Sequence, residues 1–251
     1  MSSSLPPEIL DLIVDHLHDE PATLMVCCLA SKPWVPRTRR YLFVRVEFRL
    51  YGPSLESWMK AFPDPSNSPA HYTRSLFLSC SKEIAVAIPD AHLWVRSFNH
   101  IVELTVEADG LNDRCVSFTQ LHGISPTLKS LHLFFAPPPE VLNLVCSFPL
   151  LEDLSLRFSA YGAERENADE WSAPPASPRF TGSLLLYYSA SHITRKLLDL
   201  PGSLRFSKVS VFCPSRDSDL TTQLVSKCSD TLESLLIGVD DGAFSIASAV
   251  G

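Results

Sequence analysis

The sequence is poor in the features that mark several large classes of protein. Glycine, at 9 of 251 residues, is too scarce for repeated phosphate-cradling loops. No run approaches the roughly 20 apolar residues of a membrane helix, and no secretory signal opens the chain. The net charge of -7 provides no basic surface for a nucleic-acid backbone. We therefore expect a soluble intracellular protein, of the cytoplasm or nucleus, that binds neither membranes nor nucleic acids.

Motifs for catalysis are also missing. The sequence contains no G-x-S-x-G, no P-loop, no H-E-x-x-H and no dinucleotide fingerprint. Its seven cysteines include no C-x-x-C, so we expect reduced, mostly buried thiols. A small α/β hydrolase, the enzymatic alternative, would need a nucleophile on a strand-to-helix elbow, which we do not find. The sequence therefore predicts a non-catalytic protein with no cofactor and no metal site.

Three short helices are predicted in the first fifty residues. Pro7 and Glu8 suit the first turn of a helix over 7–17, where apolar residues recur at helical spacing. A second helix over roughly 22–30 is apolar nearly all round, and Pro36 opens a third. An apolar helix must be covered on more than one side, and about 40 residues bury too little surface to be stable alone. The segment therefore predicts a missing partner surface.

An ordered set of residues along these helices resembles the F-box motif. The set is Leu5-Pro6, Glu8-Ile9, Ile13, Leu17, Leu24, Leu29, Ser31-Lys32, Trp34 and Leu42-Phe43. The resemblance covers residues 1–43 and implies docking on a Skp-family adaptor, which links to a cullin. The adaptor contacts that it implies are Leu5, Pro6, Ile9, Ile13, Leu17, Leu24, Cys28, Leu29 and Trp34. For Ile13 and Leu29, packing within the three-helix core is an equal alternative, and Ala30 replaces the valine usual in the family.

A five-residue pattern, polar–apolar–x–apolar–x, recurs seven times in the rest of the chain. The copies are SLFLS at 75, ELTVE at 103, SLHLF at 130, DLSLR at 153, SLLLY at 183, KVSVF at 208 and SLLIG at 234. Most have another apolar residue three positions upstream of the first, as Ile101 stands before Leu104, whereas the fifth copy offers Phe180, four positions upstream. This core and its spacing resemble leucine-rich repeats, whose period is about 20–29 residues. The asparagine usual after the strand is missing, so the array is degenerate.

The predicted fold is α/β, a three-helix F-box followed over 44–251 by a curved leucine-rich-repeat-like solenoid with a parallel sheet. Strands are expected near 44–50, 74–79, 101–107, 127–134, 151–157, 182–188, 206–212 and 232–237. Helices are expected near 54–62, 139–148 and 219–228. Another α/β fold with coincidental spacing is the alternative. The tail carries no polar cap, which indicates a chain truncated at its C-terminus.

Two further features are candidates for partner contacts. The insertion over 161–179 carries acidic residues and an aromatic side chain, which could hold the target through Glu170 and Trp171. The alternative is a solvated loop with Trp171 folded back on the array. A basic cluster of Arg37, Arg39, Arg40 and Arg45 would face either an acidic groove on a partner or solvent.

The function that these features imply is that of an adaptor. The F-box resemblance implies a substrate-recognition subunit of a Skp–cullin–F-box ubiquitin ligase, in which the repeats bind an unknown target protein. The alternative is a leucine-rich-repeat protein-binding scaffold that takes no part in ubiquitination. The target cannot be inferred from the fold, because arrays of one fold bind unrelated ligands.

Overall fold

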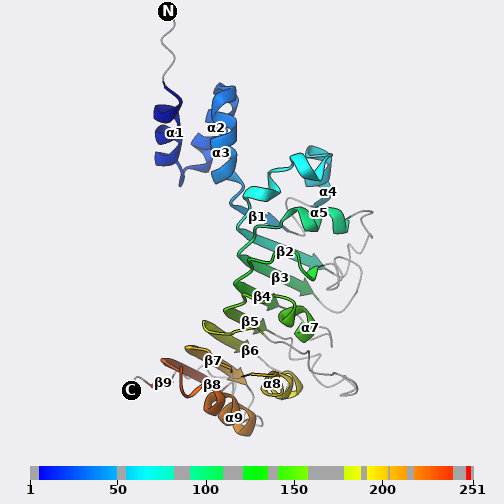
Figure 1. Cartoon of the computed structure of the whole chain (residues 1–251), viewed down its shortest axis with the longest axis vertical. Helices are drawn as coiled ribbons and strands as arrows, with labels where there is room; N and C mark the ends of the chain where they lie inside the picture. The colour runs from blue at the N-terminus through cyan, green and yellow to red at the C-terminus, as the bar shows by residue number, and fades with distance from the viewer. Residues whose placement is uncertain are drawn as a thin grey trace, which may run out of the picture.

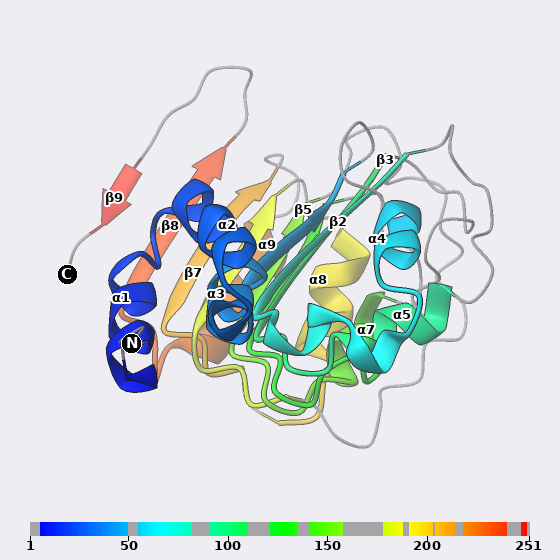
Figure 2. The same cartoon turned by 90° about the horizontal axis from the view of Figure 1, so that it is seen from above.

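The computed structural model of the protein describes residues 6–49, 55–81, 91–109, 121–134, 141–157, 178–187, 191–202, 204–213, 218–239 and 247–249. Three short helices lie at one end of a long twisted sheet, whose strands follow one another along the molecule (Figure 1). Further helices gather along one side of the sheet (Figure 2). The protein is therefore an α/β protein, as the sequence predicts.

The three N-terminal helices match their predicted places to within one or two residues. They are α1 (Pro7–His16), α2 (Pro21–Ala30) and α3 (Val35–Leu42). A proline stands in the first turn of each, where its missing N–H costs no helical hydrogen bond. A short 3-10 turn, η1 (Lys32–Trp34), connects α2 to α3.

Among the described residues, nine strands form one sheet in the order in which the chain visits them. They are β1 (Arg45–Phe48), β2 (Ser75–Ser81), β3 (Glu103–Asp109), β4 (Ser130–Phe134), β5 (Asp153–Arg157), β6 (Ser183–Tyr187), β7 (Lys208–Cys213), β8 (Ser234–Val239) and β9 (Ala247–Ala249). The first eight pair in parallel, each with its neighbour in sequence.

Two expectations for the sheet need correction. All eight predicted strands begin one to three residues later than expected, because the upstream apolar residue of most copies lies in the turn before the strand. Ile101, Leu128 and Leu151 are nevertheless fully buried there. The sheet is also not wholly parallel, since β9, which the sequence did not predict, pairs antiparallel with β8.

The helices between strands are short. They are α4 (Leu55–Ala61), α5 (Ala91–Ser97), α7 (Val141–Cys146), α8 (Ser191–Leu198) and α9 (Ser218–Cys228), with the 3-10 turns η2 (Pro65–Asn67) and η3 (Pro69–Tyr72). Among the described residues of the predicted helix over 139–148, α7 ends at Cys146, and α4 and α9 lie close to their predicted ranges. Buried apolar residues of these helices join those of the strands in one core.

Two rows of buried side chains cross the sheet on its helix-covered face. The first row is Val46, Leu76, Leu104, Leu131, Leu154, Leu184 and Val209, and the second is Phe48, Leu78, Val106, Leu133, Leu156, Leu186 and Val211. In the fifth copy, Phe180 fills the upstream position, and its ring stacks on that of Phe206 with the centroids 4.9 Å apart. Each copy therefore contributes to a continuous core, which no single copy could form.

A repeated backbone hydrogen bond sets the register where the strands begin. The carbonyl just before a strand accepts from two successive N–H groups of the next copy. The carbonyl of Val44 accepts from Arg74 at 2.8 Å and Ser75 at 3.1 Å, and that of Arg74 accepts from Val102 at 2.7 Å and Glu103 at 3.0 Å. This repeated hydrogen bond aligns the first residues of neighbouring strands.

One side chain takes part in this pattern at the step to β6. Among the described residues, the carbonyl of Glu152 accepts from Gly182 alone, and Asp153 Oδ1 accepts from the N–H of Ser183 at 2.6 Å instead. The Ser183 hydroxyl at 2.7 Å and the Ser130 hydroxyl at 3.1 Å also donate to this carboxylate. A Cβ on Gly182 would lie 2.4 Å from Asp153 Oδ1, so a larger residue there would displace the carboxylate that accepts these bonds.

Aromatic side chains connect the N-terminal helices to the sheet. Phe43 follows α3 directly and meets Trp58 of α4 edge-to-face, with ring centroids 5.6 Å apart, and Phe62 at 6.0 Å. Trp58 also contacts Phe48 of β1 and Phe98, each at 5.7 Å. Such contacts add about 0.5–1.5 kcal/mol each beyond area burial, so they restrict movement at this joint.

We expect Leu131→Ala to lower the free energy of unfolding by about 2–5 kcal/mol, because it leaves a cavity in the first buried row. Urea unfolding followed by circular dichroism would measure the loss. The control is Leu150→Ala, since Leu150 is 53% exposed and its truncation should change stability by less than about 0.5 kcal/mol. Equal losses from the two variants would contradict the stacked core.

Candidate protein-binding surface on the N-terminal helices

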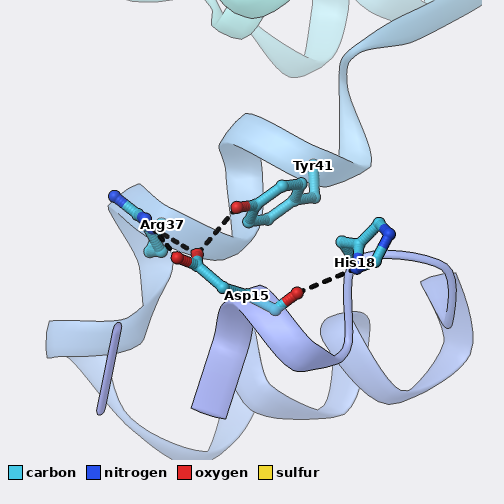
Figure 3. Close-up of polar contacts among 4 residues, drawn as sticks. All are labelled: Asp15, His18, Arg37 and Tyr41. Atoms are coloured by element: carbon cyan, nitrogen blue, oxygen red, sulfur yellow. Dashed lines mark hydrogen bonds and ion pairs between the residues drawn. The ribbon is translucent and has the colours of Figure 1, made fainter. Parts of the chain in front are cut away.

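A polar network holds α1 against α3. The guanidinium of Arg37 donates to Asp15 through Nε at 2.6 Å and Nη2 at 2.5 Å. The hydroxyl of Tyr41, one turn further along α3, donates to the same carboxylate at 2.7 Å (Figure 3). The backbone carbonyl of Asp15 also lies 2.9 Å from Nδ1 of His18. One carboxylate thus fixes the relative position of two helices.

This network keeps the Asp15 carboxylate ionised. The hydrogen bond from Arg37, and then that from Tyr41, lower the pKa of Asp15 from 3.8 to about 2. The same contacts raise the pKa of Arg37 and of Tyr41, so each partner favours its present protonation state. The bidentate geometry is the strongest that a guanidinium and a carboxylate form.

The apolar core between these helices is small. Its buried side chains are Val14 of α1, Leu24 and Cys27 of α2, and Thr38 of α3. The Thr38 hydroxyl lies 2.8 Å from the Trp34 carbonyl and 2.6 Å from Cys28 Sγ. With so little burial, the three helices depend on the polar network and on the joint to the sheet.

Most of the apolar side chains of α1 and α2 remain exposed. Among the described residues, six of the ten exposed large hydrophobic side chains belong to these two helices: Ile9, Leu12, Ile13, Met25, Val26 and Leu29. In α1 they are spaced i, i+3, i+4, and in α2 Leu29 lies three residues after Val26 and four after Met25, so each set lies on one face of its helix. Leu29 is 89% exposed and Val26 64%. We call these two stripes the apolar surface of α1 and α2, and surfaces of this kind mark interaction sites.

The sequence-predicted contact residues fall into three groups. Pro6, Ile9, Ile13 and Leu29 are exposed, whereas Leu17, Cys28 and Trp34 are half-buried. Leu24 is the correction: only 1% of it is exposed, because it fills the core between the helices and so offers no surface to a partner. Leu5, Glu170 and Trp171 lie outside the described residues.

The prediction from sequence missed three residues of this surface, Leu12, Met25 and Val26. Leu12 could have been found from its i+3 spacing to Ile9, and the other two from the apolar character of α2 on every side. In the basic cluster, Arg37 pairs with Asp15, while Arg39, Arg40 and Arg45 are exposed.

The four cysteines that the structure describes in side-chain detail are free thiols. Cys27 and Cys228 are buried, and Cys28 and Cys146 are half-buried. Burial raises the pKa of Cys146 to about 11, so its thiol stays protonated at neutral pH. Within the described ranges, no three His, Cys, Asp or Glu side chains gather as metal ligands would.

Comparisons with known proteins add no assignment. A scan against protein-family models and a search of curated proteins both return no match. In the part of the chain that the structure describes, no helix has the length and apolar character needed to span a bilayer.

We expect the stabilising effect of Asp15 to depend on pH. Because folding lowers its pKa from 3.8 to about 2, the contribution is complete above pH 3.8 and disappears as the pH falls through about 2. Asp15→Asn should therefore lower the thermal unfolding midpoint at neutral pH, and the difference from the natural chain should shrink in acid. Circular dichroism melts at a series of pH values would measure this.

The matched control for this titration is Asp230→Asn, at an exposed position far from α1 in the sequence. It should not reproduce the acid-dependent difference. A difference for Asp15→Asn that stays constant from pH 7 to below the folded pKa of about 2 would contradict the network as the cause.

Proposed function

We propose that residues 1–43 form an F-box that docks on a Skp-family adaptor, and that the sheet and helices after it form a degenerate leucine-rich-repeat solenoid. On this proposal the protein is the substrate-recognition subunit of a Skp–cullin–F-box ubiquitin ligase. It would be a non-catalytic adaptor, with a target protein bound to the repeats.

The observation that carries the proposal is the apolar surface of α1 and α2. Leu12, Val26 and Leu29 are exposed, and the helices that carry them, α1 and α2, lie at one end of the molecule, beyond the sheet (Figure 1). Covering one such leucine would contribute about 1.5–3 kcal/mol, so a few of them could support a stable complex. Ile9 and Ile13, which the F-box motif also assigns to docking, share this surface.

The sheet supports the second half of the proposal. Eight parallel strands in chain order, of which β1 to β7 each place two in-register side chains in the core, are what stacked strand–helix repeats would produce. The interval between copies agrees with the period of leucine-rich repeats.

The work of such a protein would be to hold two partners at a fixed separation. A target bound to the repeats would be kept near the ubiquitin carrier, which raises the effective concentration of its lysines. The aromatic joint around Trp58 supports this role, since it restricts movement between the N-terminal helices and the sheet.

We expect Leu29→Lys to weaken binding to a co-expressed Skp-family adaptor by about 10- to 100-fold. The substitution removes an apolar contact that the proposed complex would bury and puts a charge in its place. Pull-down and gel filtration of the full chain would measure binding. Leu93→Lys is the matched control, since Leu93 is also an exposed leucine, 48% exposed, but lies on α5.

If the natural chain binds the adaptor and Leu29→Lys binds it equally well, the proposed docking surface is wrong. No adaptor binding at all would favour the alternative, a leucine-rich-repeat scaffold outside ubiquitination. Immunoprecipitation of the natural chain for a cullin separates the two functions directly.

A further inference from the structure

The face of the sheet opposite the buried rows carries its own ordered side chains. At the carboxyl-terminal end of β4 to β7, register places Phe134 beside Arg157, Arg157 beside Tyr187, and Tyr187 beside Phe212. These residues alternate with the buried Leu133, Leu156, Leu186 and Val211, so they face away from the helices. We call Phe134, Arg157, Tyr187 and Phe212 the aromatic–arginine row.

Direct contacts connect the members of this row. The Arg157 guanidinium lies over the Tyr187 ring, 4.7 Å from its centroid, and the Tyr187 and Phe212 centroids are 5.2 Å apart. The next position in register is Gly238, where a Cβ would lie 2.3 Å from Phe212 Cδ1. Because Gly238 has no side chain, this position of β8 leaves room for the Phe212 ring.

Arg157 has an exposed cation without an acidic partner among the described residues. The same face holds another arginine over an aromatic ring, Arg49 over Phe77, but Glu47 pairs with Arg49 at 2.8 Å. Asp153 shares a strand and a face with Arg157, yet its carboxylate already accepts hydrogen bonds from Ser130 and Ser183. A guanidinium stacked on a ring keeps its edge free for bidentate pairing with a carboxylate.

The dimensions of the row match a short extended peptide. Four strands at about 4.8 Å spacing span roughly 14 Å, which is the length of about four extended residues. Glu107 of β3 is exposed at one end of the same register, beside Phe134. Its charge would repel an acidic group there, so an anion is best placed over β5, with apolar groups towards β7.

We propose that the aromatic–arginine row binds an extended segment of a partner protein, in which an Asp or Glu carboxylate pairs with Arg157 and a neighbouring apolar side chain packs on Tyr187 and Phe212. The proposal deepens the function given above and rests on it only in taking this partner to be the ubiquitination target. Such a contact would bury an apolar side chain of the partner against two aromatic rings and pair its carboxylate with an arginine. Aromatic residues and arginine are enriched in the hot spots of protein interfaces.

The test begins with selection of a phage-displayed library of random linear peptides on the full chain, either with the adaptor or alone. We expect the selected peptides to share an acidic residue next to an aromatic or aliphatic one. Fluorescence anisotropy with these peptides should show about tenfold or greater weakening for Arg157→Glu, and likewise when the peptide acid is replaced by its amide. Gly238→Ala should also weaken binding, because it displaces the Phe212 ring.

Arg195→Glu is the matched control, since it makes the same charge change on exposed Arg195 of α8, on the helix-covered side. It should leave peptide affinity unchanged. Selection of no peptide, a consensus without an acid, or equal losses from Arg157→Glu and Arg195→Glu would each overturn the inference. The affinity of the natural chain for the amide peptide tests the role of the carboxylate without any variant of the protein, so poor folding of a variant does not affect this measurement.

The two proposals fail separately in this design. A chain that binds the adaptor but selects no acidic–apolar peptide overturns only the inference about the row. A chain that selects such peptides while ignoring the adaptor overturns only the docking proposal and keeps the peptide-binding face.

Discussion

Two rows of aliphatic side chains, kept in register across the parallel strands, determine most of the remaining structure. From β1 to β7 they place two residues of each strand under the helices and most of the intervening residues on the open face. A slip of one residue at any strand would send its leucines into water and its polar residues into the core. Pairs of N–H groups that bind one carbonyl oppose such slips, and at the step to β6 the Asp153 carboxylate replaces the carbonyl for one N–H of the pair. The aromatic–arginine row exists because the same register is kept from β4 to β8.

The N-terminal helices follow a different physical plan. Their few buried side chains, such as Val14 and Leu24, leave the large apolar residues Leu12, Val26 and Leu29 in water. Association between the helices depends on one carboxylate that binds a guanidinium and a phenol. Such a unit keeps its shape while most of its large apolar side chains stay exposed.

The sequence predicts those features that local pattern determines. The period of two in SLHLF or DLSLR locates strands, and the prolines at 7, 21 and 36 locate the starts of helices. Contacts between distant residues were not predictable in this way. Asp15 meets Arg37 and Tyr41 only after three helices have packed, and Arg157 meets Tyr187 only once β5 and β6 are in register. Leu24 was assigned to the wrong side because a helix that is apolar all round does not show which side faces its neighbours.

The chain-ordered sheet has a consequence for how proteins of this architecture can change in evolution. Because each strand pairs only with its neighbours in sequence, duplication or loss of one copy would leave all other pairings intact. Each event would move everything beyond it by one strand spacing, about 4.8 Å, relative to α1 and α2. The reach of the molecule can therefore be adjusted in discrete steps, while the side chains at its two ends stay the same.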